Sequence, residues 1–500
     1  MPAIVRRRLA PFQPTRRDYL WSWAATAVVT LIAGLLRLRN VDHPKGKIFD
    51  ELYYATEGWA LLQHGVEWNE KDNAASYVVH PPLGKWAIAL GEQIYGYNEF
   101  GWRISAVVAG TLSVLLLVRI ARLMFHSTVL GCAAGLLMAL DGFHLVLSRA
   151  ALLDIFLGLF LLAAFGALVV DREARRRRWL RALEGGLDPT RPGRAGRLPF
   201  AVPWRRLLAA VLLGCALGVK WSAVFFFPAY LLLVLFWDAG ARRSAGVPRP
   251  WRETWRAEYG WLFAYGVLLT ATYLASWTGW FVTDDGYFRN WLADSGQEQR
   301  PILGDLQNLF HYHQEALKFH TGLGSYHKYQ SWPWQWLLLG RPVAFYYSSD
   351  GPCGGGACAS EVLLLGTPVL WWSFLPALAA LAWLGIARRD WRAGAIWMGV
   401  AAGLVPWFYY ALEGRTMFSF YVLPALPFLI MAVVYALGAM MSPPPGHPAD
   451  EGRRTTGAII AGGYVLFVAV CFAWYYPIFI GQPIPYADWN ARMLLGGRWI

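Results

Sequence analysis

The sequence is poor in charged residues and in cysteine for a chain of this length. Only 15% of its 500 residues are charged and five are cysteines, while 56% are hydrophobic. The mean hydropathy is +0.34, which argues against a string of soluble domains, although the length alone would allow several. The composition favours one all-α, polytopic membrane protein.

Motifs that are typical of several other kinds of site are also missing. No Gly-rich phosphate loop or dinucleotide fingerprint is recognisable, which argues against a soluble nucleotide-bound substrate. No tight set of His, Asp and Glu residues has the spacing of metal ligands, so we expect neither a metal nor another cofactor. No internal repeat of solenoid period and no prominent pair of broken helices is present.

The apolar residues form runs that are long enough to cross a membrane. A helix needs roughly 20 such residues to span the hydrocarbon core, and the sequence predicts about eleven transmembrane helices on this criterion. The runs lie near residues 20–38, 101–124, 129–147, 150–170, 205–218, 222–237, 260–281, 362–387, 393–412, 416–441 and 456–480.

The arginines predict the orientation of these spans. The loops at 171–204 and 238–258 are rich in Arg, and so is the segment before the first span. Because such loops stay in the cytoplasm, the N-terminus is expected inside, and an odd number of spans puts the C-terminus outside. A basic run can also bind nucleic acid, but alternation with apolar spans favours topology, so we expect no nucleic-acid partner.

Two large loops then lie outside, at residues 39–100 and 282–361. The segments Glu51–Leu62 and Leu83–Ile94 of the first loop, and Trp332–Trp336 of the second, are suited to interfacial helices. The loops divide the chain into an N-terminal membrane module (1–281), an extracytoplasmic loop (282–361) and a C-terminal transmembrane module (362–500).

Ionisable residues near the outer ends of the spans form the candidate site. Charges close to the hydrocarbon region are costly and are candidates for function by default. Because these residues all fall on one side, we expect a single outward-facing polar site built from several helix ends. The residues are Asp50, Glu51, His80, Arg149, Asp154, Lys220 and Arg415.

Most of these residues also have a purely structural explanation. Arg149 could pair with Asp154, and Lys220 could extend its ammonium group to lipid headgroups. His80, which precedes two prolines, could only shape a turn, and Asp50 could cap the helix that follows it. Their joint placement on one side of the membrane favours a shared site.

Six short motifs are spread over nearly the whole chain: Phe49–Glu51, His80–Lys85, Leu147–Asp154, Gly218–Ser222, His327–Trp334 and Tyr421–Phe428. In order and spacing they resemble the protein O-mannosyltransferases, which belong to the GT-C class of membrane glycosyltransferases. Residues 319–323 and 341–347 are similar to the bacterial branch. The eukaryotic members carry a β-trefoil-type insertion in the second outer loop, and this loop is too short to hold it.

The resemblance implies what the site binds. The donor would be a polyprenyl-phosphate-mannose lipid, and the acceptors would be Ser or Thr hydroxyl groups of exported polypeptides, reached during translocation at the outer face of the plasma membrane. Asp50 would be the catalytic base with Glu51 beside it, and Arg149 and Lys220 would contact the donor phosphate. His80, Asp154 and Arg415 are expected to line the pocket, and residues 1–281 to form the catalytic GT-C module.

This chemistry suits the residue types. A sugar phosphate leaves as a stable anion, so the proton donor that a glycosidase needs is dispensable. What remains is one base to accept the acceptor's proton and cations that stabilise the leaving phosphate. Direct displacement would invert the anomeric carbon and give an α-mannoside from a β-linked donor.

The five cysteines separate into two groups. Cys132, Cys215 and Cys471 lie in apolar runs and are expected to be core residues. Cys353 and Cys358 flank a Gly-rich turn in the second outer loop, where an oxidising compartment favours a disulfide over free thiols or a metal site.

Two other functions have to be considered. A transferase with the same core could use a glycolipid or a polysaccharide as its acceptor. A transporter would often carry its site near the membrane midplane between repeats, whereas the ionisable residues here lie on one side. Membrane lipids are expected to surround the protein in each case.

Overall fold

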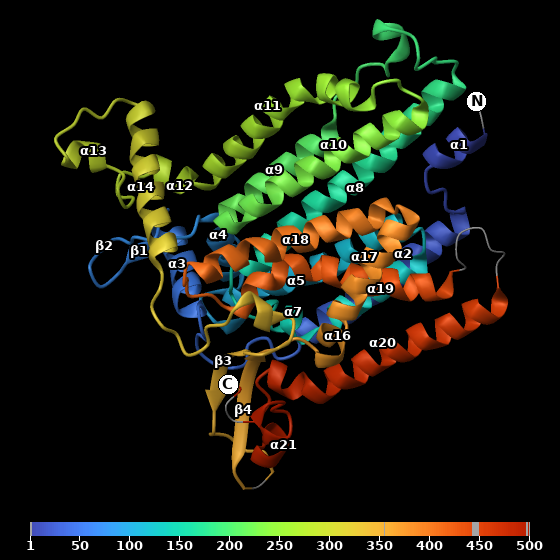
Figure 1. Cartoon of the computed structure of the whole chain (residues 1–500). Coiled ribbons are helices and arrows are strands. Elements are labelled where there is room, and N and C mark those ends of the chain that lie inside the picture. Colours follow the sequence, from blue (N-terminus) through green and yellow to red (C-terminus); the bar gives the residue numbers. More distant parts are fainter. Residues whose placement is uncertain (1–2, 355, 443–449, 497–498, 500) are drawn as a thin grey trace.

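The protein is an elongated bundle of helices with a small sheet attached at one side (Figure 1). The structure is a computed structural model that describes residues 3–354, 356–442, 450–496 and 499. Its described strands are β1 (Trp68–Asn69), β2 (Ala74–Ala75), β3 (Val343–Ser348), β4 (Cys358–Leu364) and β5 (Ile484–Pro485).

Its α-helices are α1 (Ala3–Leu9), α2 (Arg16–Leu38), α3 (Glu51–His64), α4 (Leu83–Tyr95), α5 (Glu99–Phe125), α6 (Thr128–Ala139), α7 (Gly142–Leu147), α8 (Asp154–Glu184), α9 (Trp204–Val219), α10 (Phe226–Ala245), α11 (Pro250–Ser276), α12 (Thr278–Val282), α13 (Trp291–Asp294), α14 (Leu303–Gly322), α15 (Pro333–Trp336), α16 (Pro368–Trp372), α17 (Phe374–Arg388), α18 (Trp391–Leu412), α19 (Leu426–Met441), α20 (Glu451–Phe479) and α21 (Tyr486–Asn490). Three 3₁₀ helices complete the set: η1 (Gly193–Gly196), η2 (Trp221–Phe225) and η3 (Ser419–Ala425).

Eight described helical segments are long and apolar enough to cross a membrane. They include α2, α5, α8, α18 and α20, and the segments that join α16 to α17, η2 to α10 and η3 to α19. The other three predicted spans correspond to α6, α9 and α11, which are shorter or less apolar. The polytopic helical class is therefore confirmed, while the number eleven and the orientation stay predictions.

The predicted spans differ from the structure where polar residues interrupt them. The third span breaks at Asp141, whose carboxylate accepts a hydrogen bond from the backbone of His144 and so caps α7. The fourth continues into α8, which carries the arginines of the 171–184 segment on a helix rather than in a loop. The eighth begins in strand β4, because residues 362–364 pair with β3. The three-stranded sheet β3–β4–β5 was not predicted.

The most buried of the eight candidate membrane spans contains α19, which packs against α17, α18 and α20. Phe428 near its start packs on Phe165 of α8 with ring centroids 4.9 Å apart. A Cβ atom at Gly399 of α18 would clash with the Phe428 ring at 2.3 Å, so the glycine allows the two helices to approach. The Phe428–Phe165 contact joins the C-terminal helices to α8 of the N-terminal ones.

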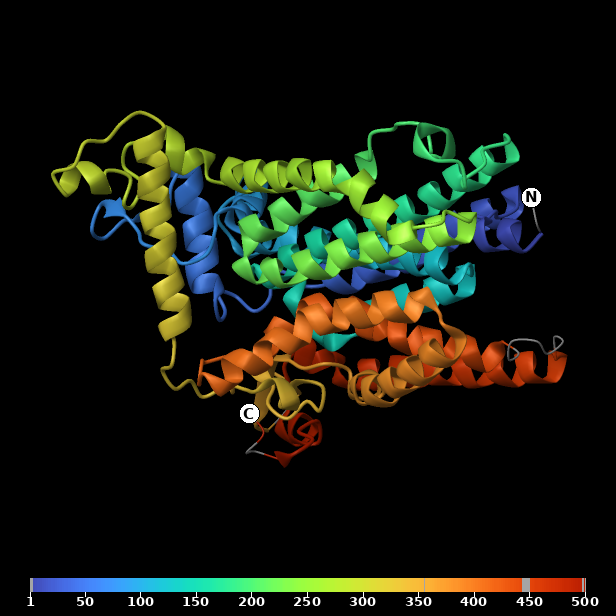
Figure 2. The same ribbon diagram turned by 45° about the horizontal axis from the view of Figure 1, so that its top comes forward.

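The first and second outer loops meet at one end of the bundle. Helices α3 and α4 of the first loop pack on each other, as predicted for Glu51–Leu62 and Leu83–Ile94. Helix α14 of the second loop lies across the end of the bundle, and α3 stands beside it (Figure 2). The N-terminus lies at the opposite end (Figure 1). The candidate site is at the end that carries α3 and α14.

Candidate active site

A cavity of about 200 Å³ opens where the two outer loops meet the helix ends. It brings together four residues that the sequence singled out: His80, Asp154, Lys220 and Arg415. They come from the loop before α4, the start of α8, the turn after α9 and the turn after α18. The rest of its lining is Leu157, Trp221, Ser222, Val224, Phe225, Leu317, His320, Thr321, Trp407, Tyr410 and Tyr421.

Lys220 and Asp154 form a buried ion pair in the wall of this cavity. Lys220 Nζ lies 2.7 Å from Asp154 Oδ2, and both residues are less than one-tenth exposed. The backbone of Lys220 is extended and separates α9 from η2, so its side chain turns inward instead of continuing a helix face. The ammonium also faces the Phe420 and Tyr421 rings, at 5.6 and 5.9 Å from their centroids. Lys220 therefore faces the cavity and not the lipid headgroups.

Asp50 lies close to this pair. It occupies the N-cap position of α3, yet its side chain forms no capping hydrogen bond with the described part of the chain. Burial raises the pKa of Asp50 to about 6; the positive charge of Lys220 opposes this rise, and the negative charge of Asp154 adds to it. A carboxylate with this pKa is ionised at neutral pH and still basic enough to accept a proton.

The backbone before Asp50 is held in an unusual conformation. Phe49 has φ of +47°, a left-handed value that is uncommon for a residue with a side chain. Its ring stacks on Phe345 of β3 at 4.5 Å and meets the edges of Phe418 and Phe420. The sheet and the η3 region thus fix the backbone that presents Asp50.

Glu51 does not share the role predicted for the acidic pair. Its carboxylate is fully buried and bonded to the Arg103 guanidinium on α5, with Nε–Oε1 and Nη2–Oε2 distances of 2.8 Å. It also accepts hydrogen bonds from the backbone N–H groups of Ile48 and Ala151. Because its oxygens are occupied in this way, Glu51 supports the site structurally by holding the start of α3 against α5.

Arg149 also differs from its predicted role. Its guanidinium donates hydrogen bonds to the backbone carbonyls of Arg37, Arg39 and Asn40, at 2.6, 2.6 and 2.8 Å. These carbonyls form the C-terminal end of α2, where a cation is favourable. Arg149 is not among the described residues that line the cavity. Neither the phosphate contact nor the pairing with Asp154 fits this geometry.

Helix α14 fixes the segment that carries His80. Tyr312 Oη accepts a hydrogen bond from the Val78 N–H and donates one to the Val78 carbonyl. His320 Nε2 lies 2.9 Å from the Val79 carbonyl, and its ring is 5.2 Å from the ring of His80. Burial lowers the pKa of both histidines, that of His80 to well below the usual value. The two rings are therefore neutral at pH 7.

Arg415 supplies the second cation of the cavity. Its Nε donates to the His320 carbonyl at 2.8 Å, which orients the guanidinium toward the cavity. The group also lies 5.8 Å from the centroid of Tyr410 and 5.6 Å from that of Tyr421. Because the histidines are neutral, Lys220 and Arg415 are the positively charged side chains among the described residues that line the cavity.

Sequence reasoning missed several residues that support this site. Lys85 of α4 is fully buried and pairs with Glu57 of α3, 3.2 Å away, and with Glu67. The triad ties the two helices of the first outer loop together. Lys85 ends the motif His80–Lys85, and His320 lies within residues 319–323, but neither motif by itself indicates these contacts. The sequence signal that could have indicated this contact is the presence of Glu57 and Lys85, of opposite charge, in the two neighbouring amphipathic helices.

The second outer loop carries a disulfide between Cys353 and Cys358. The bond closes the connection between β3 and β4, next to the strand that supports Phe49. The other three cysteines are partly buried thiols.

The arrangement suits transfer of a group from a phosphate to a hydroxyl. It combines a carboxylate of raised pKa, two cations and a wall with five Phe, Trp and Tyr side chains, and aromatic side chains are common in ligand pockets. No group of three or more His, Cys, Asp or Glu residues suited to a metal ion occurs within the described ranges.

Two family models match the chain. One is described as the C-terminal four TMM region of protein-O-mannosyltransferase and matches residues 305–499. The other is described as dolichyl-phosphate-mannose-protein mannosyltransferase and matches residues 79–184. The matched regions include His80, Asp154 and Arg415.

Curated proteins and a solved structure are similar over almost the whole chain. A polyprenol-phosphate-mannose–protein mannosyltransferase of Mycolicibacterium smegmatis is 40% identical, over 96% of this chain and 93% of that protein. The protein of the same name from Corynebacterium glutamicum is 32% identical, over 95% and 92%. The Saccharomyces cerevisiae protein O-mannosyltransferase Pmt1–Pmt2 complex bound to the sugar donor has the same fold, with a TM-score of 0.72, 12% identity, and coverage of 98% of this chain and 94% of that chain.

Proposed function

The chain belongs to the polyprenol-phosphate-mannose–protein mannosyltransferase family, and we propose that it transfers mannose from a polyprenyl-phosphate-mannose lipid to Ser or Thr hydroxyl groups of exported polypeptides. The observation that carries this proposal is a cavity at a helix end that is lined by Lys220, Asp154 and Arg415. Asp50 is not one of the lining residues, but it lies close enough to Lys220 and Asp154 for their charges to shift its pKa. A membrane-edge position suits a donor whose sugar is in water and whose chain is in lipid.

The reaction is a direct displacement at the anomeric carbon. The acceptor hydroxyl oxygen forms a bond to C1 of mannose while the bond between C1 and the phosphate oxygen breaks. Asp50 takes the hydroxyl proton, and the polyprenyl phosphate leaves with the electron pair of the broken bond. The raised pKa of Asp50 supports its assignment as base, because a carboxylate of ordinary pKa would bind this proton more weakly. One displacement inverts a β-linked donor into an α-mannoside.

Lys220 and Arg415 stabilise the phosphate as it leaves. Arg415 offers a planar fork to two phosphate oxygens, and Lys220 offers a point charge. Both are largely buried, so their charges act in a medium of low dielectric constant, where they stabilise a developing negative charge more than in water. The proton acceptor and the two cations together supply what this reaction needs, so the transfer proceeds without a metal ion.

The site faces the outside of the plasma membrane in this proposal. The charge pattern supports the orientation, because the arginine-rich segments 171–204 and 238–258 lie at the other end of the spans. Polypeptides that emerge during translocation then reach the cavity from the side of α14, which contributes Leu317, His320 and Thr321 to its lining.

The test is a transfer assay with purified protein. Labelled polyprenyl-phosphate-mannose is incubated with a Ser- and Thr-containing peptide, with the same peptide carrying Ala at those positions, and with a glycolipid acceptor. We expect label only in the hydroxyl peptide, as an α-mannoside. Asp50→Asn should bind donor normally but slow transfer by about two to four orders of magnitude. Transfer to the glycolipid alone would refute the polypeptide acceptor.

A further inference from the structure

A second and larger cavity lies at the opposite end of the helices from the candidate active site. Its volume is about 590 Å³, and it is enclosed by the second half of α8, the connection from Pro189 to Pro203, the end of α10 and the start of α11. Arg175 of α8 lines it and stands 21 residues after Asp154 of the first site, which is roughly 32 Å at helical rise. This is about the thickness of a bilayer core, so the two cavities face opposite membrane surfaces.

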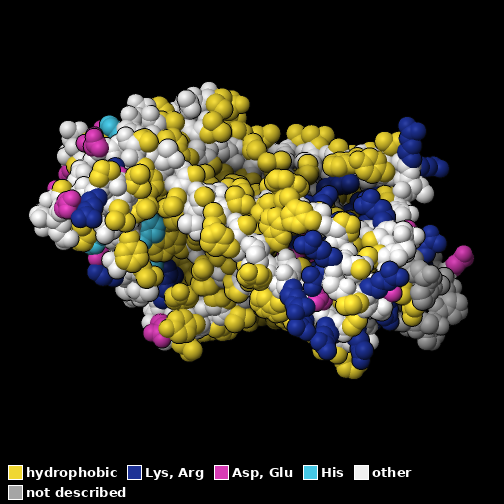
Figure 3. Space-filling view, turned by 90° about the horizontal axis from the view of Figure 1, so that it is seen from above, with side chains coloured by type: hydrophobic (Ala, Val, Ile, Leu, Met, Phe, Trp, Pro, Cys, Tyr) yellow, Lys and Arg dark blue, Asp and Glu magenta, His cyan; other side chains and the backbone are white. Residues whose placement is uncertain are grey.

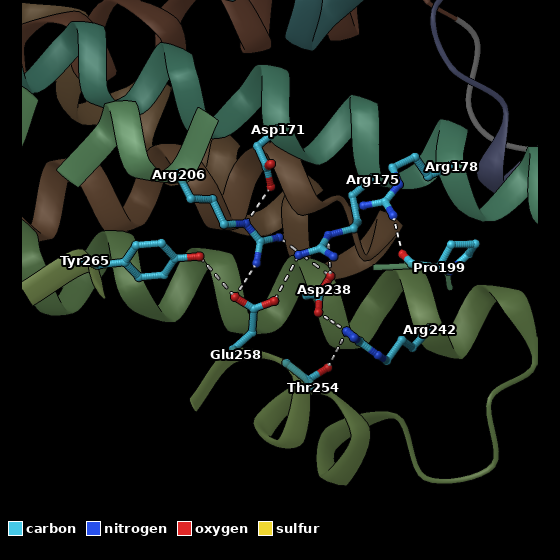
Figure 4. A network of polar contacts seen from close by, with 10 residues as sticks. All are labelled: Asp171, Arg175, Arg178, Pro199, Arg206, Asp238, Arg242, Thr254, Glu258 and Tyr265. Atoms are coloured by element: carbon cyan, nitrogen blue, oxygen red, sulfur yellow. Dashed lines mark hydrogen bonds and ion pairs between the residues drawn. The ribbon is translucent and has the colours of Figure 1, made fainter. Parts of the chain in front are cut away.

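A charge-balanced network lies beside this cavity (Figure 4) and contributes Arg175, Arg242 and Glu258 to its lining. Arg206 Nε lies 2.7 Å from Asp171, and Arg175 lies 2.9 Å from Glu258 and 3.2 Å from Asp238. Arg242 contacts Asp238 as well. Three guanidinium groups thus face three carboxylates, and the protein neutralises the buried charges by itself.

Around the rim of the cavity, positive side chains outnumber negative ones. Six further arginines line it, and the acidic residues that contact them are Glu253, which pairs with two, and Asp188, 3.6 Å from a third. Four positive charges therefore remain in excess around the opening. The six are Arg178, Arg191, Arg197, Arg249, Arg252 and Arg256.

Arg249 and Arg252 are the rim arginines with the fewest polar contacts. Both are exposed, and neither forms a side-chain hydrogen bond or an ion pair with the part of the chain that the structure describes. Arginine-rich loops on the inner side are expected from topology alone. Topology does not require that the arginines surround a hollow, and this gathering around a cavity indicates an anionic ligand.

The wall of the cavity continues into a surface that faces lipid. Phe200 and Trp261 line the opening, stack at 6.2 Å, and Phe200 is 82% exposed. Along α11 an aromatic side chain recurs every fourth residue, from Trp251 to Phe263, and these side chains are 40–78% exposed. Residues four apart lie on one helix face. Such exposed aromatic residues are typical of the headgroup region of a membrane.

Figure 3 shows the same neighbourhood on the molecular surface. Lys and Arg side chains gather at the end of the molecule that carries the N-terminus, and a broad band of hydrophobic side chains begins directly beside them. An anion held by the rim arginines would have water on one side and the apolar face of α11 on the other. A lipid headgroup meets both surroundings, whereas a soluble phosphate would leave the aromatic stripe uncovered.

We propose that this cavity binds the phosphate of an anionic membrane lipid, with the headgroup among the rim arginines and the acyl chains along α11. Arginine suits the task because its planar fork donates two hydrogen bonds to phosphate oxygens, and basic pockets between transmembrane helices are known to take anionic headgroups. The bound lipid would neutralise the rim and tie α8, α10 and α11 together. The site does not depend on the function proposed above.

The test compares two double variants of the full chain that lose the same charge. Arg249→Gln with Arg252→Gln removes the two unpaired rim cations, and Arg177→Gln with Arg243→Gln removes two exposed cations of α8 and α10 that do not line the cavity. Each purified protein is titrated with phosphatidylglycerol and with phosphatidylcholine, and the bound lipid is counted by native mass spectrometry. Thermal unfolding confirms that both variants are folded.

We expect wild type to prefer phosphatidylglycerol, the rim variant to lose roughly thirtyfold in its affinity, and the control to change by less than about threefold. Equal losses in both variants would show general surface attraction and overturn the proposal, as would no loss in either. A third arm adds inorganic phosphate. Inorganic phosphate should not displace the lipid at millimolar concentration; if the rim variant loses phosphate binding but keeps lipid binding, the ligand is a free anion and the lipid assignment is wrong.

Discussion

Glu51 and Arg103 face each other through two parallel hydrogen bonds, each 2.8 Å long, between side chains that are both fully buried. The pair anchors the first turn of α3 to α5. Asp50, one residue earlier, takes no part in it and lies toward the ion pair of Lys220 and Asp154. Two adjacent acidic residues thus have separate tasks, because the helix directs their side chains differently.

Because of this separation, we expect substitutions of the two residues to have different effects on the stability of the fold. Glu51→Ala leaves the Arg103 charge buried without its partner, which should lower the free energy of unfolding by about 3–5 kcal/mol. Asp50→Asn should unfold close to wild type, because the Asp50 side chain makes no capping bond with the described residues. Thermal unfolding of the purified proteins measures both. If the Glu51→Ala protein is as stable as wild type but inactive, Glu51 has a catalytic role and the structural assignment is wrong.

The pKa of Asp50 predicts the acid limb of the pH profile. Asp50 must be ionised to accept a proton, so kcat/KM should fall as the pH drops through about 6, and not near 4 as for an ordinary Asp. Lys220→Gln removes the charge that lowers this pKa and should move the limb to higher pH. Asp154→Asn removes a charge that raises it and should move the limb to lower pH. Shifts in the same direction would contradict the assignment.

The two cavity cations predict the affinity for the donor. Lys220→Gln and Arg415→Gln should each weaken binding of a polyprenyl phosphate by about ten- to a hundredfold, since each removes a charge-assisted hydrogen bond. Lys45→Gln is the matched control, because Lys45 is exposed and pairs with Asp42 away from the cavity. Donor affinity that is unchanged in both cavity variants would exclude them as phosphate ligands.

Arg149 should matter for the fold and not for the donor. Arg149→Ala removes three hydrogen bonds to the end of α2 and should lower the unfolding temperature, and Arg149→Lys should restore only part of the loss because a point charge cannot replace the fork. Donor affinity measured on the same folded protein should stay near wild type. A loss of affinity at unchanged stability would support the phosphate contact that the sequence suggested.

Labelling of single cysteines tests the orientation. Gly185 and Ser325 are both exposed and lie at opposite ends of the helices, after α8 and after α14. In cells, a cysteine at Ser325 should react with an impermeant thiol reagent, while one at Gly185 should be protected until the membrane is permeabilised. The protein with only its native cysteines provides the background. The reverse pattern would place the candidate site in the cytoplasm.

The membrane helices could be predicted from the sequence because the length of an apolar run decides whether it can form a helix that spans the membrane. Each apolar run contains or overlaps a helix of the structure, and the two interfacial helices of the first loop begin where expected, at Glu51 and Leu83. What the runs could not show is where buried polar groups interrupt them. Asp141 ends a span because its carboxylate bonds the backbone of the next turn, and residues 362–364 are a strand because β3 offers them a partner.

The candidate site was predicted in part, for a similar reason. His80, Asp154, Lys220 and Arg415 share a cavity, since helix ends converge at one side of the bundle and the chain places all four there. Glu51 and Arg149 stand in the same motifs but bond to Arg103 and to the end of α2. These partners lie about 50 and 110 residues away in sequence, and only the folded chain shows which contact a charged side chain makes.

The ion pair of Lys220 with Asp154 has a consequence for how the donor enters. The resting cavity already contains the counterion of its lysine, so an arriving lipid phosphate has to compete with a carboxylate and does not meet a bare ammonium group. We therefore expect binding of the phosphate to Lys220 to be an exchange of one anion for another. Because the charge of Lys220 lowers the pKa of Asp50, its neutralisation by a bound phosphate would raise that pKa, so Asp50 would be a stronger base while the donor is bound.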